Sequence, residues 1–79
     1  MTATLSFRDW LLQRIEDDTP VGDLARDATR DPDWEGDTPA SLRQSMARHH
    51  ACWAACVTLE DAARRWEVDD LLAVLDADD

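Results

Sequence analysis

The stretch that decides the fold runs from Ser6 to Trp34 and reads SFRDWLLQRIEDDTPVGDLARDATRDPDW. Ser6 stands three residues before Asp9, which is the spacing of a capping box at the start of a helix. Apolar residues then recur at helical intervals on one face, and polar residues take the other face. The apolar residues are Phe7, Trp10, Leu11 and Ile15. This pattern predicts an amphipathic helix over residues 7–16.

The second half of the stretch predicts another capped helix. Thr19-Pro20 is a cap with proline at the first helical position, and Asp31-Pro32 ends the helix because the residue before a proline avoids the helical region. The apolar face between these two signals holds Val21, Leu24, Ala25 and Ala28. We expect this second helix over residues 20–30.

A loop and a third helix follow. Residues 31–39 hold two of the three prolines and one of the two glycines, so they form the main loop. We expect Trp34 in this loop to plug the core rather than to meet a ligand. Thr38-Pro39 repeats the cap with a first-turn proline and predicts a helix over residues 39–50. Its apolar face carries Leu42, Met46 and His49.

A fourth helix is predicted over residues 52–67. Five residues are spaced four, three, four and three apart, which places them along one face of a helix as a straight seam. These residues are Cys52, Cys56, Leu59, Ala63 and Trp66.

A second apolar stripe lies just beyond that seam and consists of Val68, Leu71, Leu72 and Leu75. It is rotated away from the seam, so either the helix breaks near Val68 or a continuous helix carries a second face. In the first case Asp69-Asp70 caps a separate helix over residues 69–76, and the stripe belongs to the core. In the second case the stripe is an exposed patch for a protein partner or for a two-fold copy of the chain. The four stripe residues are therefore our candidate partner-binding residues.

These patterns predict an all-α fold, a compact bundle of four or five short helices. We divide the chain into a helical domain over residues 1–67 and an acidic amphipathic helix or tail over residues 68–79. A chain of 79 residues buries only ~60% of its unfolded surface, so its stability rests on a few large side chains such as the four tryptophans. The expected core consists of Phe7, Trp10, Leu11, Ile15, Val21, Leu24, Ala25, Leu42, Met46, Cys56, Leu59, Ala63 and Trp66.

The first half of the chain resembles a known family. The motifs are F-x-x-W-L-L at residues 7–12, P-V-G-D-L-A-x-D at residues 20–27 and D-P-x-W at residues 31–34. They are similar to the YozE-like family of small bacterial proteins with a SAM-like fold. The resemblance continues more weakly to residue 66, where the family's closing helix is matched with departures at Leu59, Ala63 and Trp66. It implies a compact SAM-like four-helix domain without an established enzymatic activity.

Charge and composition narrow the classes of partner. Eight arginines, no lysine and eighteen acidic residues give a net charge of −10, which repels phosphate backbones and anionic membranes. We therefore expect neither nucleic-acid binding nor membrane binding. The N-terminus lacks the basic and apolar parts of a signal peptide, and we expect a cytoplasmic protein.

One cluster has residue types that bind metals, namely His49, Cys52 and Cys56. Structural zinc sites draw two ligand pairs from separate elements at short spacings that are missing here. We therefore expect the cysteines to be small core residues with free thiols, His49 to lie at the rim of the core, and no metal or other cofactor to bind. The pair also lacks an orienting group and a glycine-rich oxyanion loop, so we expect no enzymatic activity.

Two functional hypotheses remain open. The first is a non-enzymatic protein–protein interaction module that binds an unidentified protein or forms a homodimer. The alternative is an inhibitor that imitates DNA, in which carboxylates stand in for phosphates on a nucleic-acid-binding or host defence protein. Two rows of carboxylates on one convex face would favour the mimic, whereas an even scatter of acidic residues would count against it.

Overall fold

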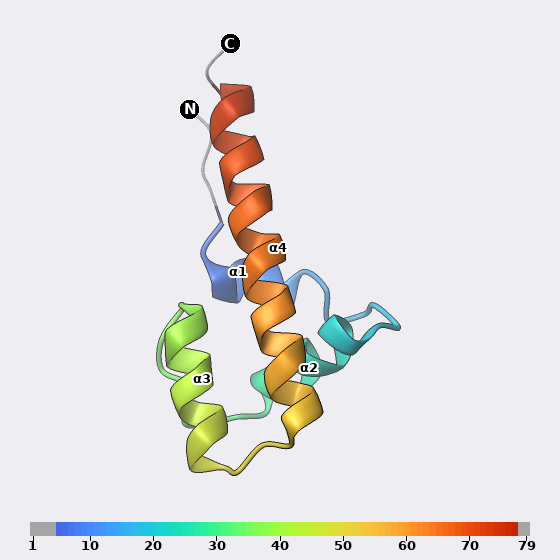
Figure 1. Cartoon of the computed structure of the whole chain (residues 1–79), viewed down its shortest axis with the longest axis vertical. Helices are drawn as coiled ribbons and strands as arrows, with labels where there is room; N and C mark the ends of the chain where they lie inside the picture. The colour runs from blue at the N-terminus through green and yellow to red at the C-terminus, as the bar shows by residue number, and fades with distance from the viewer. Residues whose placement is uncertain (1–4, 78–79) are drawn as a thin grey trace.

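The computed structural model describes residues 5–77, with side chains for all of them except residues 74, 76 and 77. Four helices follow one another in this range and no strand occurs within it (Figure 1). They are α1 (Phe7–Leu12), α2 (Pro20–Thr29), α3 (Pro39–Arg48) and α4 (Trp53–Ala77). The predicted all-α bundle is confirmed. None of these helices is both long enough and apolar enough to cross a bilayer.

The first three helices begin at the residues that the capping signals predict. The side chains of Ser6, Thr19 and Thr38 each accept a hydrogen bond from a backbone N–H three residues later. In α3 the bond is reciprocal, because the Ser41 hydroxyl also accepts from the backbone N–H of Thr38 at 3.2 Å. Each cap satisfies donors that a helix leaves free in its first turn, so the local sequence suffices to fix these three starts.

α1 ends at Leu12, four residues before the predicted end. Tighter turns follow, in which the backbone N–H groups of Arg14, Ile15 and Asp17 each bond a carbonyl three positions earlier. Two guanidinium groups take carbonyls that a longer helix would use. Arg14 donates to the Trp10 carbonyl at 2.8 Å, and Arg26 of α2 donates to the Ile15 carbonyl at 2.7 Å. A side chain from the next helix therefore competes with the helical hydrogen bonds at this end.

α3 ends at Arg48, two residues before the predicted end, through a motif that the sequence pattern does not indicate. His50 has a positive φ of 54°, and its N–H bonds the Ala47 carbonyl at 3.3 Å. The Ala51 N–H bonds the Met46 carbonyl at 3.0 Å, which completes a Schellman motif with histidine in the place usually taken by glycine. This turn directs the chain from α3 into α4.

The core lies between α4 and the three shorter helices, all of which contact α4. On α4 the buried residues are Leu59, Ala62 and Ala63, and we call this side the inner face. Phe7 of α1 packs against Trp10 and against Trp66 of α4, with ring centroids 6.0 and 5.8 Å apart. Trp34 is buried as predicted, and its indole N–H bonds the Ser41 hydroxyl at 2.8 Å.

The predictions for four side chains need correction. Cys56 is exposed, because the inner face is centred between Leu59 and Ala62 rather than along the line from Cys56 to Ala63. Trp53 is 81% exposed and anchors nothing within the domain. Ile15 and Trp66 are only partly buried, although both pack against the core.

α4 is a single helix, so the predicted break near Val68 and the separate helix over residues 69–76 are wrong. At 1.5 Å per residue its 25 residues span ~37 Å, which accounts for most of the 44 Å length of the molecule. The helices α1, α2 and α3 lie beside only its first part, and the remainder projects beyond them (Figure 1). The alternative that a continuous helix carries a second apolar face is confirmed.

Candidate functional site

The second apolar face of α4 points away from the core. At ~100° of rotation per residue, Val68 lies roughly 180° around the helix from Leu59, which is the most buried large side chain of the inner face. Val57 and Leu75 lie within ~20° of Val68 by the same rule. We call this side the outer face. Its apolar residues are Trp53, Val57, Val68, Leu71, Leu72 and Leu75.

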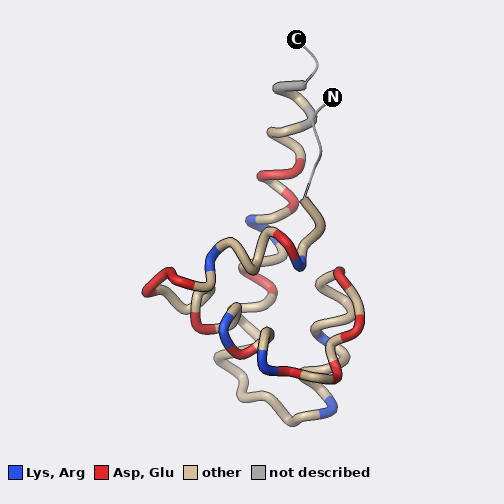
Figure 2. The backbone as a smooth tube through the Cα atoms, turned by 180° about the vertical axis from the view of Figure 1, so that it is seen from behind, with Lys and Arg blue, Asp and Glu red and all other residues tan. Residues whose placement is uncertain are grey.

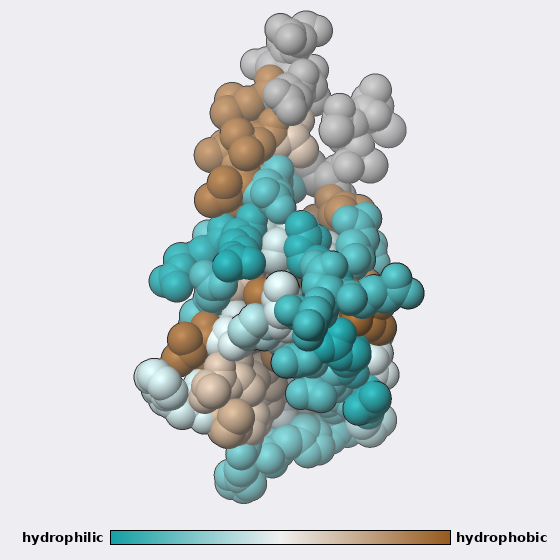
Figure 3. Space-filling model, turned by 90° about the vertical axis from the view of Figure 1, so that its right-hand side faces the viewer, coloured by the Kyte–Doolittle hydropathy of each residue, from teal (hydrophilic) through white to brown (hydrophobic). Residues whose placement is uncertain are grey.

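The apolar residues of the outer face are open to solvent. Val57 is 45% exposed, and the four predicted partner-binding residues, Val68, Leu71, Leu72 and Leu75, are 52–58% exposed. The space-filling view shows a hydrophobic patch over the projecting part of α4, the part that contains Val68, Leu71, Leu72 and Leu75 (Figure 3). Together with Trp53 and Val57 they account for six of the seven large hydrophobic residues that are exposed in the described part of the chain. The exposed apolar surface is therefore concentrated on one face of one helix.

Contacts with α1 hold α4 at the level where it leaves the bundle. The Trp10 indole N–H donates to Asp69 Oδ2 at 2.8 Å, and the Arg14 guanidinium lies 3.7 Å from the centre of the Trp10 ring while pairing with the same carboxylate at 3.4 Å. The Trp66 indole N–H, one turn before Asp69, donates to the Leu5 carbonyl at 2.9 Å. These bonds fix the rotation of α4, so the outer face stays turned outward.

The middle of the outer face is charged. Asp61 and Arg64 lie on it between Val57 and Val68. Asp61 pairs with Arg65 at 3.2 Å, one turn further along α4. Among the side chains that the structure describes, Arg64 forms no ion pair within 4 Å. The hydrogen bond from Arg43 is the main cause that lowers the pKa of Glu60, and the charge of Arg64 adds to it. Along its length, the outer face is therefore apolar at both ends and charged in the middle.

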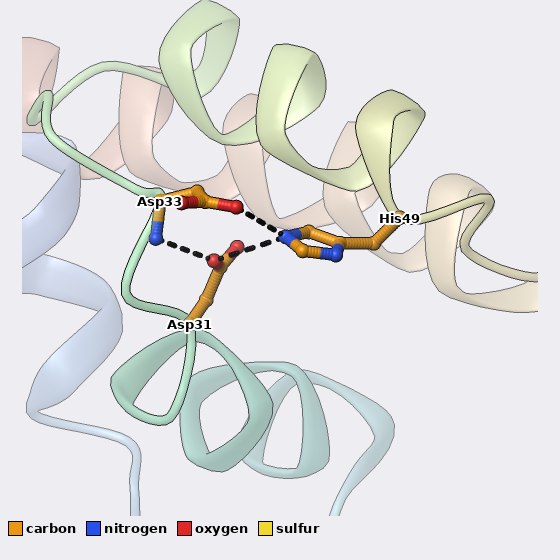
Figure 4. A group of neighbouring side chains, drawn as sticks. All are labelled: Asp31, Asp33 and His49. Carbon is orange, nitrogen blue, oxygen red and sulfur yellow. Dashed lines mark hydrogen bonds and ion pairs between the residues drawn. The ribbon is translucent and has the colours of Figure 1, made fainter.

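A second cluster joins the main loop to the end of α3, and its members are Asp31, Asp33 and His49 (Figure 4). His49 Nε2 lies 2.9 Å from Asp33 Oδ2 and 3.5 Å from Asp31 Oδ1. Asp31 also accepts a hydrogen bond from the Asp33 backbone N–H at 2.9 Å and another from the buried Ser45 hydroxyl. The hydrogen bond from Ser45 is the main cause that lowers the pKa of the Asp31 carboxyl, and His49 and the Asp33 N–H act in the same direction.

One ligand atom from each of these three residues lies within 4.8 Å of the others, so the cluster has the donor types and spacing to hold a divalent cation. The same atoms already bond one another and Ser45. The role of these bonds is structural, because they hold the loop against α3. Beside it, Leu24, Ala28, Leu42 and Met46 line an apolar pocket of about 280 Å³, with Asp31 and His49 at its edge.

The predicted grouping of His49 with Cys52 and Cys56 is not what the structure brings together. Both cysteines are free and exposed, while His49 turns toward the loop. The Schellman turn at His50 interrupts the helical spacing on which that grouping depended. The aspartates that His49 contacts come from a distant part of the sequence, and nothing in the local pattern indicates them.

Comparisons with models of protein families, with curated proteins and with solved structures give no match for this chain. The resemblance to the YozE-like family therefore stays a prediction.

Proposed function

We propose that this protein is a non-enzymatic interaction module that binds a protein partner through the outer face of α4. The observation that carries the proposal is the concentration of exposed apolar side chains on that face. Exposed apolar patches rimmed by charged residues commonly mark protein–protein contact sites. Fully burying one leucine or valine side chain stabilises a complex by about 1.5–3 kcal/mol, so a partner that covered several of these half-exposed residues would gain a substantial part of its binding free energy there.

The side chains with chemically reactive groups support a binding role rather than catalysis. The Ser41 hydroxyl bonds the Trp34 indole and caps α3, and the Ser45 hydroxyl is buried against Asp31. His49 pairs with two carboxylates, and no nucleophile lies beside it in that contact. Each of these three groups therefore has a structural partner, which is the arrangement of a scaffold. The two cysteine thiols are free and exposed, and His49 does not lie with them.

The distribution of acidic residues gives no support to the DNA-mimic alternative. Acidic segments occur on the turn before α2, on the loop before α3 and on α4, with arginines between them (Figure 2). A mimic of a phosphate backbone needs carboxylates in rows on one face, and this scatter does not provide them. We therefore retain protein binding through apolar contacts as the proposed function.

The experiment that tests the proposal is quantitative affinity capture from the native host. It compares the wild type with Leu71→Asp/Leu75→Asp and with the control Ala47→Asp, which changes an exposed residue on α3. We expect at least one captured protein, including a differently tagged second copy of the chain, to be lost only with the double variant. If nothing captured depends on the double substitution while that variant stays folded by circular dichroism, the proposal is wrong.

A further inference from the structure

We infer that the partner of the outer face is the same face of a second copy, paired antiparallel around a two-fold axis. This inference rests on the proposed function and names its partner. The spacing of the outer-face residues is the first support. Seven positions alternate at intervals of three and four along almost the whole of α4, which is the heptad seam of a coiled coil. These positions are Ala54, Val57, Asp61, Arg64, Val68, Leu71 and Leu75.

The seam is independent of the core. Leu59, Ala62 and Ala63 of the inner face are covered by the three shorter helices, and no seam residue belongs to that core. The start of α2 borders the seam beside Val57 and Asp61, and α1 borders it beside Val68. Every seam position whose side chain the structure describes is exposed, apart from the partly buried Asp61. A helix that carries one covered apolar face and one uncovered heptad seam has the pattern of an α-helix prepared for a second helix.

The order of residues along the seam fits a reversed copy of itself. With the two-fold axis at the level of Ala62 and Ala63, Val57 stands opposite the partner's Val68, and Ala54 stands opposite the partner's Leu71. Trp53 and Leu72, which flank the seam, also come opposite each other. Ala54 and Leu71 thus pair a small side chain with a large one, and Val57 and Val68 pair two of equal size, as side chains that pack between two helices can. Leu75 extends beyond the start of the partner's α4.

The same register pairs the charges. Asp61 stands opposite the partner's Arg64, and the two-fold axis makes this pair twice. Among the described side chains Arg64 forms no ion pair within 4 Å, although its charge adds to that of Arg43 in lowering the pKa of Glu60. In this register the partner's Asp61, which pairs with Arg65 in its own chain, comes opposite Arg64 as a further carboxylate. A parallel pair would instead place Arg64 beside Arg64 and Asp61 beside Asp61. Like charges at such positions are destabilising, and they oppose the parallel arrangement.

The net charge of the whole chain gives this partner a distinctive signature. Two copies, each carrying −10, repel one another at long range, and salt screens that repulsion. Pairing with a second copy should therefore tighten as salt rises from ~50 to ~500 mM, where the screening length becomes a few ångströms. A basic partner protein would show the opposite dependence.

The first test is analytical ultracentrifugation of the full chain from ~10 µM to ~1 mM, a range suited to a small interface of modest affinity. We expect the mass to approach twice 8.9 kDa with rising concentration, and to do so at lower concentration in higher salt. Leu71→Asp/Leu75→Asp should stay monomeric and folded, whereas the control Ala47→Asp should associate like the wild type.

The second test determines the orientation by oxidative cross-linking. Both native cysteines are first replaced by serine, which is tolerable because both are exposed. Val57→Cys and Val68→Cys are then prepared separately, with Ala47→Cys as the control. We expect rapid cross-linking in the mixture of the two variants and little in either variant alone. A cross-link within each variant alone would mean a parallel pair and would overturn the inference.

The outcomes separate the inference from the proposed function. A chain that remains monomeric up to ~1 mM at both salt concentrations overturns self-pairing. If such a chain still captures a host protein in a manner that depends on Leu71 and Leu75, the proposed function stands and only the identity of the partner is wrong. If it captures nothing, both fall.

Discussion

The two faces of α4 both carry apolar side chains, but they differ in solvent exposure. On the inner face, Leu59 and Ala62 are fully buried under the shorter helices. On the outer face, Val68 and Leu71 are more than half exposed. The difference lies in what stands opposite, because three short helices can cover only one side of a helix of 25 residues. Apolar periodicity thus shows that a face is built for contact, without showing whether the contact is within the chain.

The sharpest test of this comparison truncates one leucine on each face. Leu59→Ala should lower the free energy of unfolding by about 2–5 kcal/mol, because it removes buried contacts and leaves a cavity. Leu71→Ala should change it by less than about 0.5 kcal/mol in the monomer, because the side chain is already largely hydrated. Urea denaturation at low protein concentration measures both values. Equal losses for the two variants would show that the faces do not differ.

The second prediction concerns the close approach of α2 to the turn that follows α1. A Cβ added at Gly22 would lie 2.0 Å from the Asp17 carbonyl oxygen, a contact that only movement of backbone can relieve. Gly22→Ala should therefore cost about 1–3 kcal/mol, the typical penalty of overpacking. Thermal denaturation of the variant and the wild type measures this loss. An unchanged melting temperature in Gly22→Ala would show that the close approach does not require glycine at this position.

The third prediction concerns the hydrogen bonds of Asp31, which hold the loop against α3. Asp31→Asn should cost about 1–2 kcal/mol at pH 7, because the carboxylate accepts bonds from Ser45 and the Asp33 N–H. The folded state lowers the pKa of Asp31, so the charge stabilises the fold above the unfolded pKa of about 3.9 and loses this effect as the pH falls through the lower folded pKa. The stability difference between wild type and variant should therefore narrow below about pH 4. A difference that stays constant from pH 7 to pH 2 would contradict this account.

The smallest effect is expected at the turn that leads into α4. His50 adopts a positive φ that is unfavourable for a residue with a Cβ, whereas glycine adopts it freely. His50→Gly should raise the free energy of unfolding by about 0.5–1 kcal/mol, measured by denaturation in urea. His49→Gly is the matched comparison. It removes the bonds to Asp31 and Asp33 at a residue with an ordinary φ of −94°, and it should destabilise.

The starts of the first three helices and most of the core were predictable because their signals are local. A cap needs only Ser6, Thr19 or Thr38 and the residues just after it, and the helical period places Phe7 and Leu24 on buried faces. The end of α1 was not predictable in this way. It depends on Arg26, a side chain that reaches the Ile15 carbonyl only once α2 has packed beside α1.

For the candidate sites too, local features were predictable from the sequence, whereas features that depend on tertiary packing were not. The sequence showed that Val68, Leu71, Leu72 and Leu75 form a stripe that the neighbouring seam cannot share, because the rotation per residue of a helix is fixed. Only the tertiary structure decided that α4 continues unbroken, that this stripe faces solvent, and that Trp53 and Val57 extend it. It likewise brought His49 to Asp31 rather than to the cysteines. Neighbouring residues determine the helix caps and the apolar periodicity. The exposure of a helix face depends instead on whether distant segments of the chain pack against it.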